Sequence, residues 1–147
     1  MKKLLIIIIL IAFVAISYSE EVESPIEAIT DYFEYFNNVD KEALNKNSDS
    51  PFIFVIGNKK NVYESYGDAV DFEGLKKTGW SYSSINTIEL IYKDDVSAMV
   101  DINFSRFNKD KDPISTTDVI YLLFLKDNQW KVKSAFVQGN LSLGKDE

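Results

Sequence analysis

Arg106 and Asp118 are the charged residues whose positions in this sequence most clearly suggest a binding function. The predicted strand 96–107 alternates apolar and polar residues, and its apolar face carries Val96, Ala98, Val100, Ile102 and Phe104. Arg106 is the next position on that face, and Asp118 begins an apolar face in the following predicted strand. Hairpin geometry should bring the two side chains together. An unpaired buried charge is costly, so we expect them to form an ion pair.

Two interpretations of this pair stay open. Arg106 could present its fork of N–H donors to a carboxylate-bearing or otherwise anionic ligand, with Asp118 holding it in place. Alternatively, the two side chains simply pair near the rim of the sheet. Replacing Arg106 with Met separates the interpretations, because only the first predicts a loss of ligand affinity with little loss of thermal stability.

The composition removes several kinds of chemistry. The chain contains no His and no Cys, which excludes His-dependent nucleophile triads, thiol nucleophiles and most zinc sites. The six Gly residues are scattered singly, so the sequence has no glycine-rich phosphate loop. Any catalysis would depend on Asp, Glu, Tyr, Lys, Arg or Ser. We expect neither a metal site nor a cofactor.

Four long predicted strands must position these residues. They span 85–92, 96–107, 114–125 and 129–137, and polar turns of three to six residues join them. Ordinary strands average about 5–6 residues, so strands of this length indicate one strongly twisted, bent antiparallel sheet. A bent sheet has a hollow side, and other elements must fill it.

Predicted helices on the N-terminal side supply the filling. Ser24-Pro25-Ile26-Glu27 combines a Ser N-cap, a Pro at the first helical position and a Glu three residues after the cap. The helix that starts there has an apolar stripe at helical spacing and ends at Asn37-Asn38. A second short helix runs from Asp40 to Leu44, and a weaker third covers 68–77. A short apolar strand, 52–56, lies between them.

This order of elements resembles the nuclear transport factor 2-like, or SnoaL-like, superfamily. Three local sequences carry the resemblance: Gly79-Trp80, then residues 104–107, then the turn and strand start at 127–132. They look like those of a bacterial subgroup whose function is unassigned. The resemblance implies an α+β fold, with a cone-shaped, strongly bent antiparallel sheet and three N-terminal-side helices packed on its concave face. It implies one domain over residues 20–138, with a pocket inside the cone.

Enzymes that share the cone include ketosteroid isomerases, dehydratases and polyketide cyclases. The turn Val39-Asp40 resembles the Gly-Asp turn of the isomerases, which puts Tyr32 where their oxyanion-stabilising Tyr lies. Their catalytic base would lie near the end of the first strand, where this chain has Ile56 and Gly57 instead of an acid. Tyr32 is therefore either a hydrogen-bond donor in the pocket or a core aromatic residue.

Phe54 and Trp80 complete the candidate ligand-binding residues. Phe54 belongs to the short apolar strand, and Trp80 lies where cone proteins often line the mouth of the pocket. Trp80 could stack on a flat ligand or pack as part of the core.

The N-terminal sequence predicts export. Lys2-Lys3, thirteen apolar residues (4–16) and Ser17-Tyr18-Ser19 have the three parts of a signal peptide, so we expect cleavage after residue 19, although an uncleaved anchor stays open. Cleavage would remove Lys2 and Lys3 and take the formal charge from −7 to −9, which disfavours nucleic-acid binding. The mature domain should be periplasmic or extracellular and off the membrane, with residues 139–147 as a frayed C-terminal tail.

Three functions fit this sequence. The first is an exported, homodimeric domain that binds a small, largely apolar molecule without chemistry. The second is an isomerase, dehydratase or cyclase that uses Tyr32 as donor and a carboxylate not yet placed. The third is a dimerising protein-interaction domain, which a cavity with no room for a ligand would favour. The fold alone cannot rank them.

Overall fold

The computed structural model describes residues 22–145, so the predicted signal peptide lies outside the described residues. Within them the chain forms four helices and six strands. The helices are α1 (Pro25–Asn37), α2 (Lys41–Lys46), α3 (Tyr66–Ala69) and α4 (Phe72–Lys77). The strands are β1 (Ser48–Ile56), β2 (Lys59–Tyr63), β3 (Tyr82–Lys93), β4 (Ser97–Phe107), β5 (Pro113–Lys126) and β6 (Gln129–Val137). None of these helices is long and apolar enough to span a membrane.

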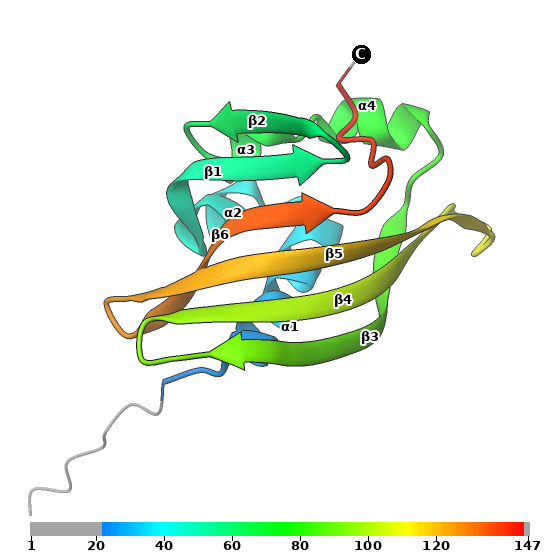
Figure 1. The fold of residues 1–147 in the computed structure, drawn as a ribbon. Helices are drawn as coiled ribbons and strands as arrows, with labels where there is room; N and C mark the ends of the chain where they lie inside the picture. The colour runs from blue at the N-terminus through cyan, green and yellow to red at the C-terminus, as the bar shows by residue number, and fades with distance from the viewer. Residues whose placement is uncertain (1–21, 146–147) are drawn as a thin grey trace, which may run out of the picture.

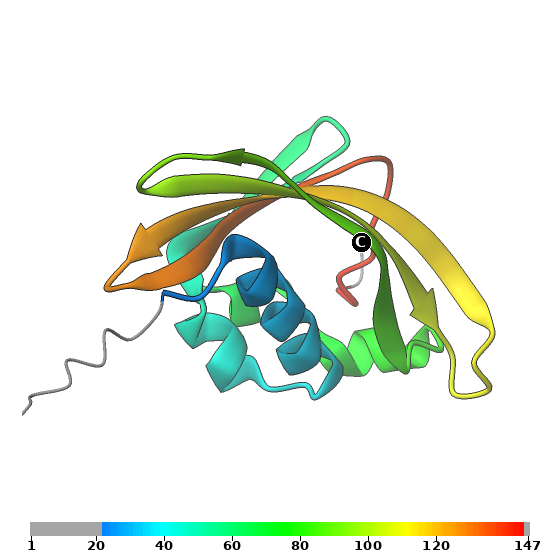
Figure 2. The ribbon, with the colours of Figure 1, turned by 90° about the horizontal axis from the view of Figure 1, so that it is seen from below.

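All six strands form one strongly curved sheet in the order β2-β1-β6-β5-β4-β3 (Figure 1). Every neighbouring pair is antiparallel except β1 and β6, which run parallel. Figure 2 shows the sheet arched over the helices. The predicted α+β class, the bent sheet and the four-strand meander are confirmed.

Irregularities in the strand pairing account for the bend. The register shifts twice between β3 and β4, and once each in the β4–β5 and β5–β6 pairs. A β-bulge bends and twists the strand that carries it, so several bulges in long strands curl the sheet around one face. The helices fill that concave face.

Helix α1 begins as predicted. The Ser24 hydroxyl accepts a hydrogen bond from the Glu27 amide (3.2 Å), and the Glu27 carboxylate accepts one from the Ser24 amide (2.8 Å). This capping box satisfies two backbone donors at the helix end. The face of α1 toward the sheet buries Ala28, Ile29, Tyr32, Phe33 and Phe36. The cap therefore fixes the start of the helix that fills the cone.

Two predicted elements differ from the structure. The third helix is divided into α3 and α4, because Val70 is extended and buried while the Asp71 carboxylate caps α4 at the Glu73 and Gly74 amides. The described part of the chain thus has four helices where three were expected. No strand was expected at residues 59–63, but they form β2 and pair with β1.

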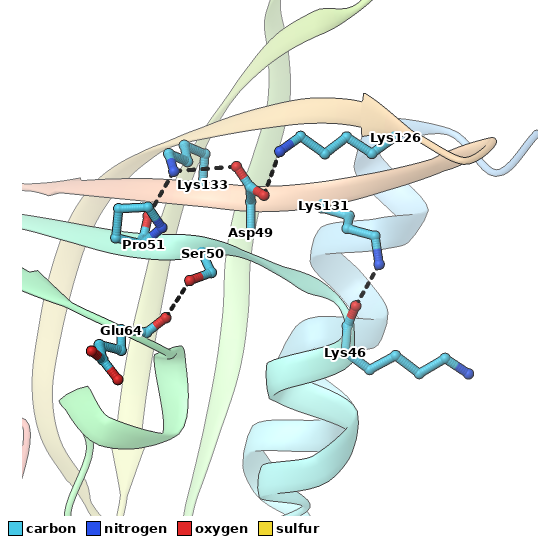
Figure 3. A network of polar contacts seen from close by, with 8 residues as sticks. All are labelled: Lys46, Asp49, Ser50, Pro51, Glu64, Lys126, Lys131 and Lys133. Atoms are coloured by element: carbon cyan, nitrogen blue, oxygen red, sulfur yellow. Dashed lines mark hydrogen bonds and ion pairs between the residues drawn. The ribbon is translucent and has the colours of Figure 1, made fainter.

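A polar network holds the irregular first half of β1 against the sheet (Figure 3). The β1–β6 register is interrupted between Ser48 and Ile53. In this interval the Asp49 carboxylate forms ion pairs with Lys126 (2.6 Å) and Lys133 (3.2 Å), and the Lys133 ammonium also donates to the Pro51 carbonyl (2.7 Å). Side-chain contacts therefore take the place of the backbone pairing between β1 and β6 that is interrupted here.

Replacing Asp49 with Asn should lower the free energy of unfolding by about 1–2 kcal/mol at pH 7. Partial burial acts to raise the pKa of Asp49, but the hydrogen bonds and charges of Lys126 and Lys133 outweigh it and hold that pKa below its usual value of 3.8. A lowered carboxyl pKa stabilises the fold above the unfolded pKa, and this stability is lost as the pH falls through the folded pKa.

Urea unfolding of the wild type and Asp49→Asn at pH 7 and pH 3 measures this effect. The difference between the two proteins should be smaller at pH 3 than at pH 7. Asp95→Asn is the matched control, because Asp95 is exposed and forms no ion pair within residues 22–145. An equal loss at both pH values would show that the amide disturbs packing and that the ion pairs contribute nothing.

Candidate functional site

The inside of the cone contains a small, largely apolar cavity. Its volume is ≈ 20 Å³, which is room for about one water molecule. Aromatic side chains make most of its wall, and Arg106, Ser83, Leu141 and Leu143 complete it. The aromatic lining residues are Tyr32, Phe33, Phe36, Phe54, Tyr66, Phe104 and Tyr121. The side chains themselves therefore fill most of the hollow side of the sheet.

Arg106 is the charged residue of this cavity, and it is the only Arg in the chain. It lies on the inward face of β4 and is 6% exposed. One guanidinium Nη donates to the Ser142 carbonyl at 2.7 Å, while Nε has no hydrogen-bond partner. No carboxylate of the described residues forms an ion pair with it. The guanidinium carbon lies 6.0 Å from the centre of the Phe104 ring.

The expected ion pair between Arg106 and Asp118 is wrong. Asp118 is exposed on the opposite, convex face, where it pairs with Asn103 in register and accepts a hydrogen bond from the Asn103 side-chain amide (2.7 Å). Directly opposed residues of an antiparallel pair share a face, and Phe104 opposes Thr117. Odd residues of β5 therefore point inward. The prediction failed because the even residues of β5 are apolar too.

Three tyrosines meet beside Arg106. Tyr32 comes from α1, Tyr66 from α3 and Tyr121 from β5, and the Tyr32 ring centre lies 5.1 Å from that of Tyr66 and 5.4 Å from that of Tyr121. Burial raises the pKa of all three phenols well above the usual value. They therefore stay neutral at physiological pH and can donate hydrogen bonds into the cavity.

Burial also lowers the pKa of Arg106, although the three phenols act in the opposite direction. A guanidinium remains protonated even so. The cavity thus combines one desolvated positive charge with three neutral hydroxyl groups.

The other candidate residues lie at different places. Phe54 is 2% exposed and lines the cavity. Trp80 lies outside it and packs against Phe36, with ring centres 5.3 Å apart, while its indole N–H donates to the Ser83 hydroxyl (3.0 Å). Trp80 instead lines a separate hollow of ≈ 180 Å³ that also contacts Arg106. Tyr32, Phe54 and Arg106 are therefore brought together, whereas Trp80 lies beside them and Asp118 does not join them.

The cavity wall contains no acidic residue among those described. The chain has no His either, so the usual bases for proton abstraction are missing from this wall. No cluster of three or more acidic side chains that could hold a metal ion occurs within residues 22–145. The lining can bind by charge, hydrogen bonding and apolar contact.

The sequence of residues 22–140 matches the model of a family described as NTF2-like protein (DUF6841). This match covers most of the chain. The chain belongs to this NTF2-like family. None of the curated proteins compared with it matches.

Solved structures share the fold of this NTF2-like chain at low sequence identity. A protein of unknown function with a cystatin-like fold from Nostoc punctiforme has a TM-score of 0.63 at 11% identity, covering 80% of this chain and 89% of its own. A proposed ketosteroid isomerase from Shewanella frigidimarina has a TM-score of 0.59 at 10% identity, covering 80% and 97%. A proposed dehydratase from Streptomyces avermitilis has a TM-score of 0.59 at 13% identity, covering 78% and 92%.

Sequence reasoning missed three parts of this NTF2-like site. Tyr66 lies just before the expected start of the third helix at residue 68 and was not a candidate. Tyr121 was not a candidate because it lies on the face of β5 that was expected to point outward. The third omission is larger. Residues 139–145, hereafter the closing segment, were expected to fray, but Leu141 and Leu143 are 9% exposed and line the cavity. Two leucines among polar residues gave no periodic signal for this position.

Proposed function

We propose that this protein is an exported domain that binds a small, largely apolar molecule with an anionic group inside its cone, without catalysis. The observation that carries the proposal is Arg106. A guanidinium that is 6% exposed, with an unpartnered Nε and no carboxylate partner within residues 22–145, is an unusual arrangement. A ligand carboxylate would supply the missing counter-charge.

The chemistry of the site supports a carboxylate in particular. The guanidinium fork matches a carboxylate geometrically and can form two parallel, charge-assisted hydrogen bonds with it. The hydroxyls of Tyr32, Tyr66 and Tyr121 add neutral donors close to that position. The remaining wall is aromatic and apolar, which suits an apolar body attached to the acid.

A binding measurement tests this function. Decanoate and 2-naphthoate serve as probes, each compared with its neutral amide, because the amide keeps the shape and removes the charge. We expect calorimetry to show that each acid binds more tightly than its amide. Arg106→Met should weaken binding of the acids by about tenfold or more, since a hydrogen bond to a charged group contributes about 1.5–3 kcal/mol. Binding of the amides should be nearly unchanged.

Tyr32→Phe is the matched control, because it changes the cavity wall and leaves the charge. It should weaken acid binding far less than Arg106→Met. Equal affinity for the acids and their amides in the wild type would contradict an anion site at Arg106.

The enzymatic alternative requires a Tyr32 hydrogen-bond donor and a carboxylate base, and only the tyrosine lies among the described residues of the cavity wall. Tyr32 lies in the cavity, and fold neighbours include a proposed isomerase and a proposed dehydratase. The carboxylate that this alternative requires is not among the described residues of the wall. The geometry therefore favours binding over proton transfer.

A protein-interaction function has a specific observation in its favour, which is the small size of the cavity. The convex face of the sheet offers a surface for a homodimer, with Phe136 43% exposed beside Ile120, Asp101 and Asp118. Strict alternation from Trp130 and Val132 would place Phe136 in the core, but both Ser134 and Ala135 are buried, which reverses the alternation. Sedimentation of the wild type and Phe136→Glu tests dimerisation through this face: the variant should be monomeric if the face forms the dimer.

A further inference from the structure

The closing segment is attached to the mouth of the cone by a few specific contacts. It has no regular secondary structure. The Leu143 carbonyl accepts from the Asp71 amide at 2.8 Å, and the Ser142 carbonyl accepts from Arg106 at 2.7 Å. The Lys145 ammonium donates to the Asp68 carbonyl and lies 4.8 Å from the Tyr63 ring centre. Figure 2 shows the chain after β6 turning beneath the arch of the sheet.

Two glycines permit this attachment. A Cβ on Gly144 would lie 1.9 Å from the Asp71 carbonyl oxygen and 2.6 Å from the Leu75 amide nitrogen. A Cβ on Gly74 would lie 1.7 Å from the Gly144 carbonyl oxygen. Real Cβ atoms do not approach so closely. The backbone of the closing segment therefore rests directly on α4, and any side chain at Gly144 would force it away.

The segment divides one region into three spaces. Leu141 lines the inner cavity, the ≈ 180 Å³ hollow beside Trp80, and a ≈ 320 Å³ hollow beside β2. Both outer hollows are of a size that could admit part of a small ligand, whereas the inner cavity admits about one water. Moving Leu141 and Leu143 would join the three spaces. Lys59 borders the larger hollow and does not belong to the closing segment, so the opened path would keep a positive charge that favours an anion.

We propose that the closing segment competes with the ligand: the Ser142 carbonyl occupies the position on Arg106 that a ligand carboxylate takes, and the segment swings away when the ligand binds. This inference rests on the proposed binding function and adds its regulation. In the closed protein, the Arg106 guanidinium donates a hydrogen bond to one backbone carbonyl, that of Ser142. The opened protein exchanges that carbonyl for a charged partner, which forms a stronger hydrogen bond.

The competition reduces the apparent affinity of the ligand by the fraction of molecules that are open. A variant whose segment cannot dock should bind more tightly. Gly144→Ala is that variant, since it combines a φ of 79° with the backbone clash. Gly139→Ala is its matched control, because Gly139 has the same φ of 79° but its Cβ would meet no atom within 4 Å.

Decanoate binding to the full chain and the exchange rate of the Asp71 amide test the inference together. We expect Gly144→Ala to bind decanoate about tenfold more tightly than the wild type, and Gly139→Ala to stay within about twofold. The Asp71 amide should lose protection in Gly144→Ala without ligand, and in the wild type when decanoate saturates it. A chain ending at Gln138 provides a second test if Gly144→Ala does not fold.

The outcomes separate the two claims. Decanoate could bind the wild type, Gly144→Ala and the chain ending at Gln138 equally well, with the Asp71 amide still protected in the wild-type complex. That result would overturn the competition, while the binding function would stand. If decanoate binds none of the proteins, including the chain ending at Gln138, the binding function fails and the competition fails with it. Tighter binding with release of the Asp71 amide supports both.

Discussion

Replacing Arg106 with Met will raise the free energy of unfolding of the ligand-free protein by about 1–3 kcal/mol. The guanidinium is 6% exposed and gains one hydrogen bond, to the Ser142 carbonyl, in return for the loss of its water shell. Its Nε has no partner. Met preserves much of the apolar stem and removes the charge, so the penalty of burying it disappears. The same change should abolish the preference for anionic ligands, so stability and function would move in opposite directions.

Urea unfolding at pH 7 measures this effect, and Lys133→Met is the comparison. Lys133 forms an ion pair with Asp49 and donates to the Pro51 carbonyl, so its loss should destabilise the protein. Opposite signs for the two substitutions would show that Arg106 lacks the compensation that Lys133 has. A clear loss of stability in Arg106→Met would instead make Arg106 a structural residue and would contradict the proposed role.

Replacing Tyr66 with Ala will lower the free energy of unfolding by about 3–5 kcal/mol, the range for removing a large aromatic side chain from a core. Tyr66 is 2% exposed. Its ring centre lies 5.0 Å from that of Phe52, 5.1 Å from that of Tyr32 and 6.0 Å from that of Phe54. The substitution removes contacts with α1 and β1 at once, because α3 reaches the core mainly through this side chain.

Tyr66→Phe is the control, since it keeps the ring and removes the hydroxyl. Tyr66→Phe should lower the free energy of unfolding by only about 1 kcal/mol. Chemical unfolding of both variants separates ring packing from hydrogen bonding. If Tyr66→Ala lost less than about 1 kcal/mol, the inside of the cone would be loosely filled, and the small cavity volume would not describe a packed interior.

The sheet could be predicted because its signals are local. Polar turns separate four long runs rich in apolar residues, and the structure places the strands within about three residues of their expected ends. Helix α1 carries its own start signal in Ser24 and Glu27. β2 could not be found in this way, because Lys59 and Lys60 give it a polar sequence and its pairing with β1 is decided by tertiary structure.

The faces of the strands were harder to predict than their bounds. Alternation identifies the inward face of β4, because its other face is polar, and Arg106 is buried as that pattern indicated. β5 is apolar on both faces, so only its register with β4 decides that Tyr121 points inward and Asp118 outward. The failure of the Arg106–Asp118 pair and the inward position of Tyr121 therefore depended on information that the sequence of one strand does not contain.

The closing segment could not be predicted for a different reason. It contains two leucines among polar residues and no periodic pattern, so its sequence resembles a frayed end. Its position depends on the fit between Gly144 and α4, which is a contact between backbones far apart in the sequence. Sequence periodicity carries no signal for such a contact.

The most direct test of the account is the side-chain Nε–H signal of arginine in a ¹H–¹⁵N NMR spectrum during a decanoate titration. Arg106 is the only Arg, so this signal needs no assignment by mutation. If Arg106 binds the carboxylate, the signal should shift on addition of decanoate, exchange more slowly with water in the complex, and not respond to decanamide. A signal that stays unchanged while decanoate binds would show that the anion lies elsewhere, and that Arg106 is not its anchor.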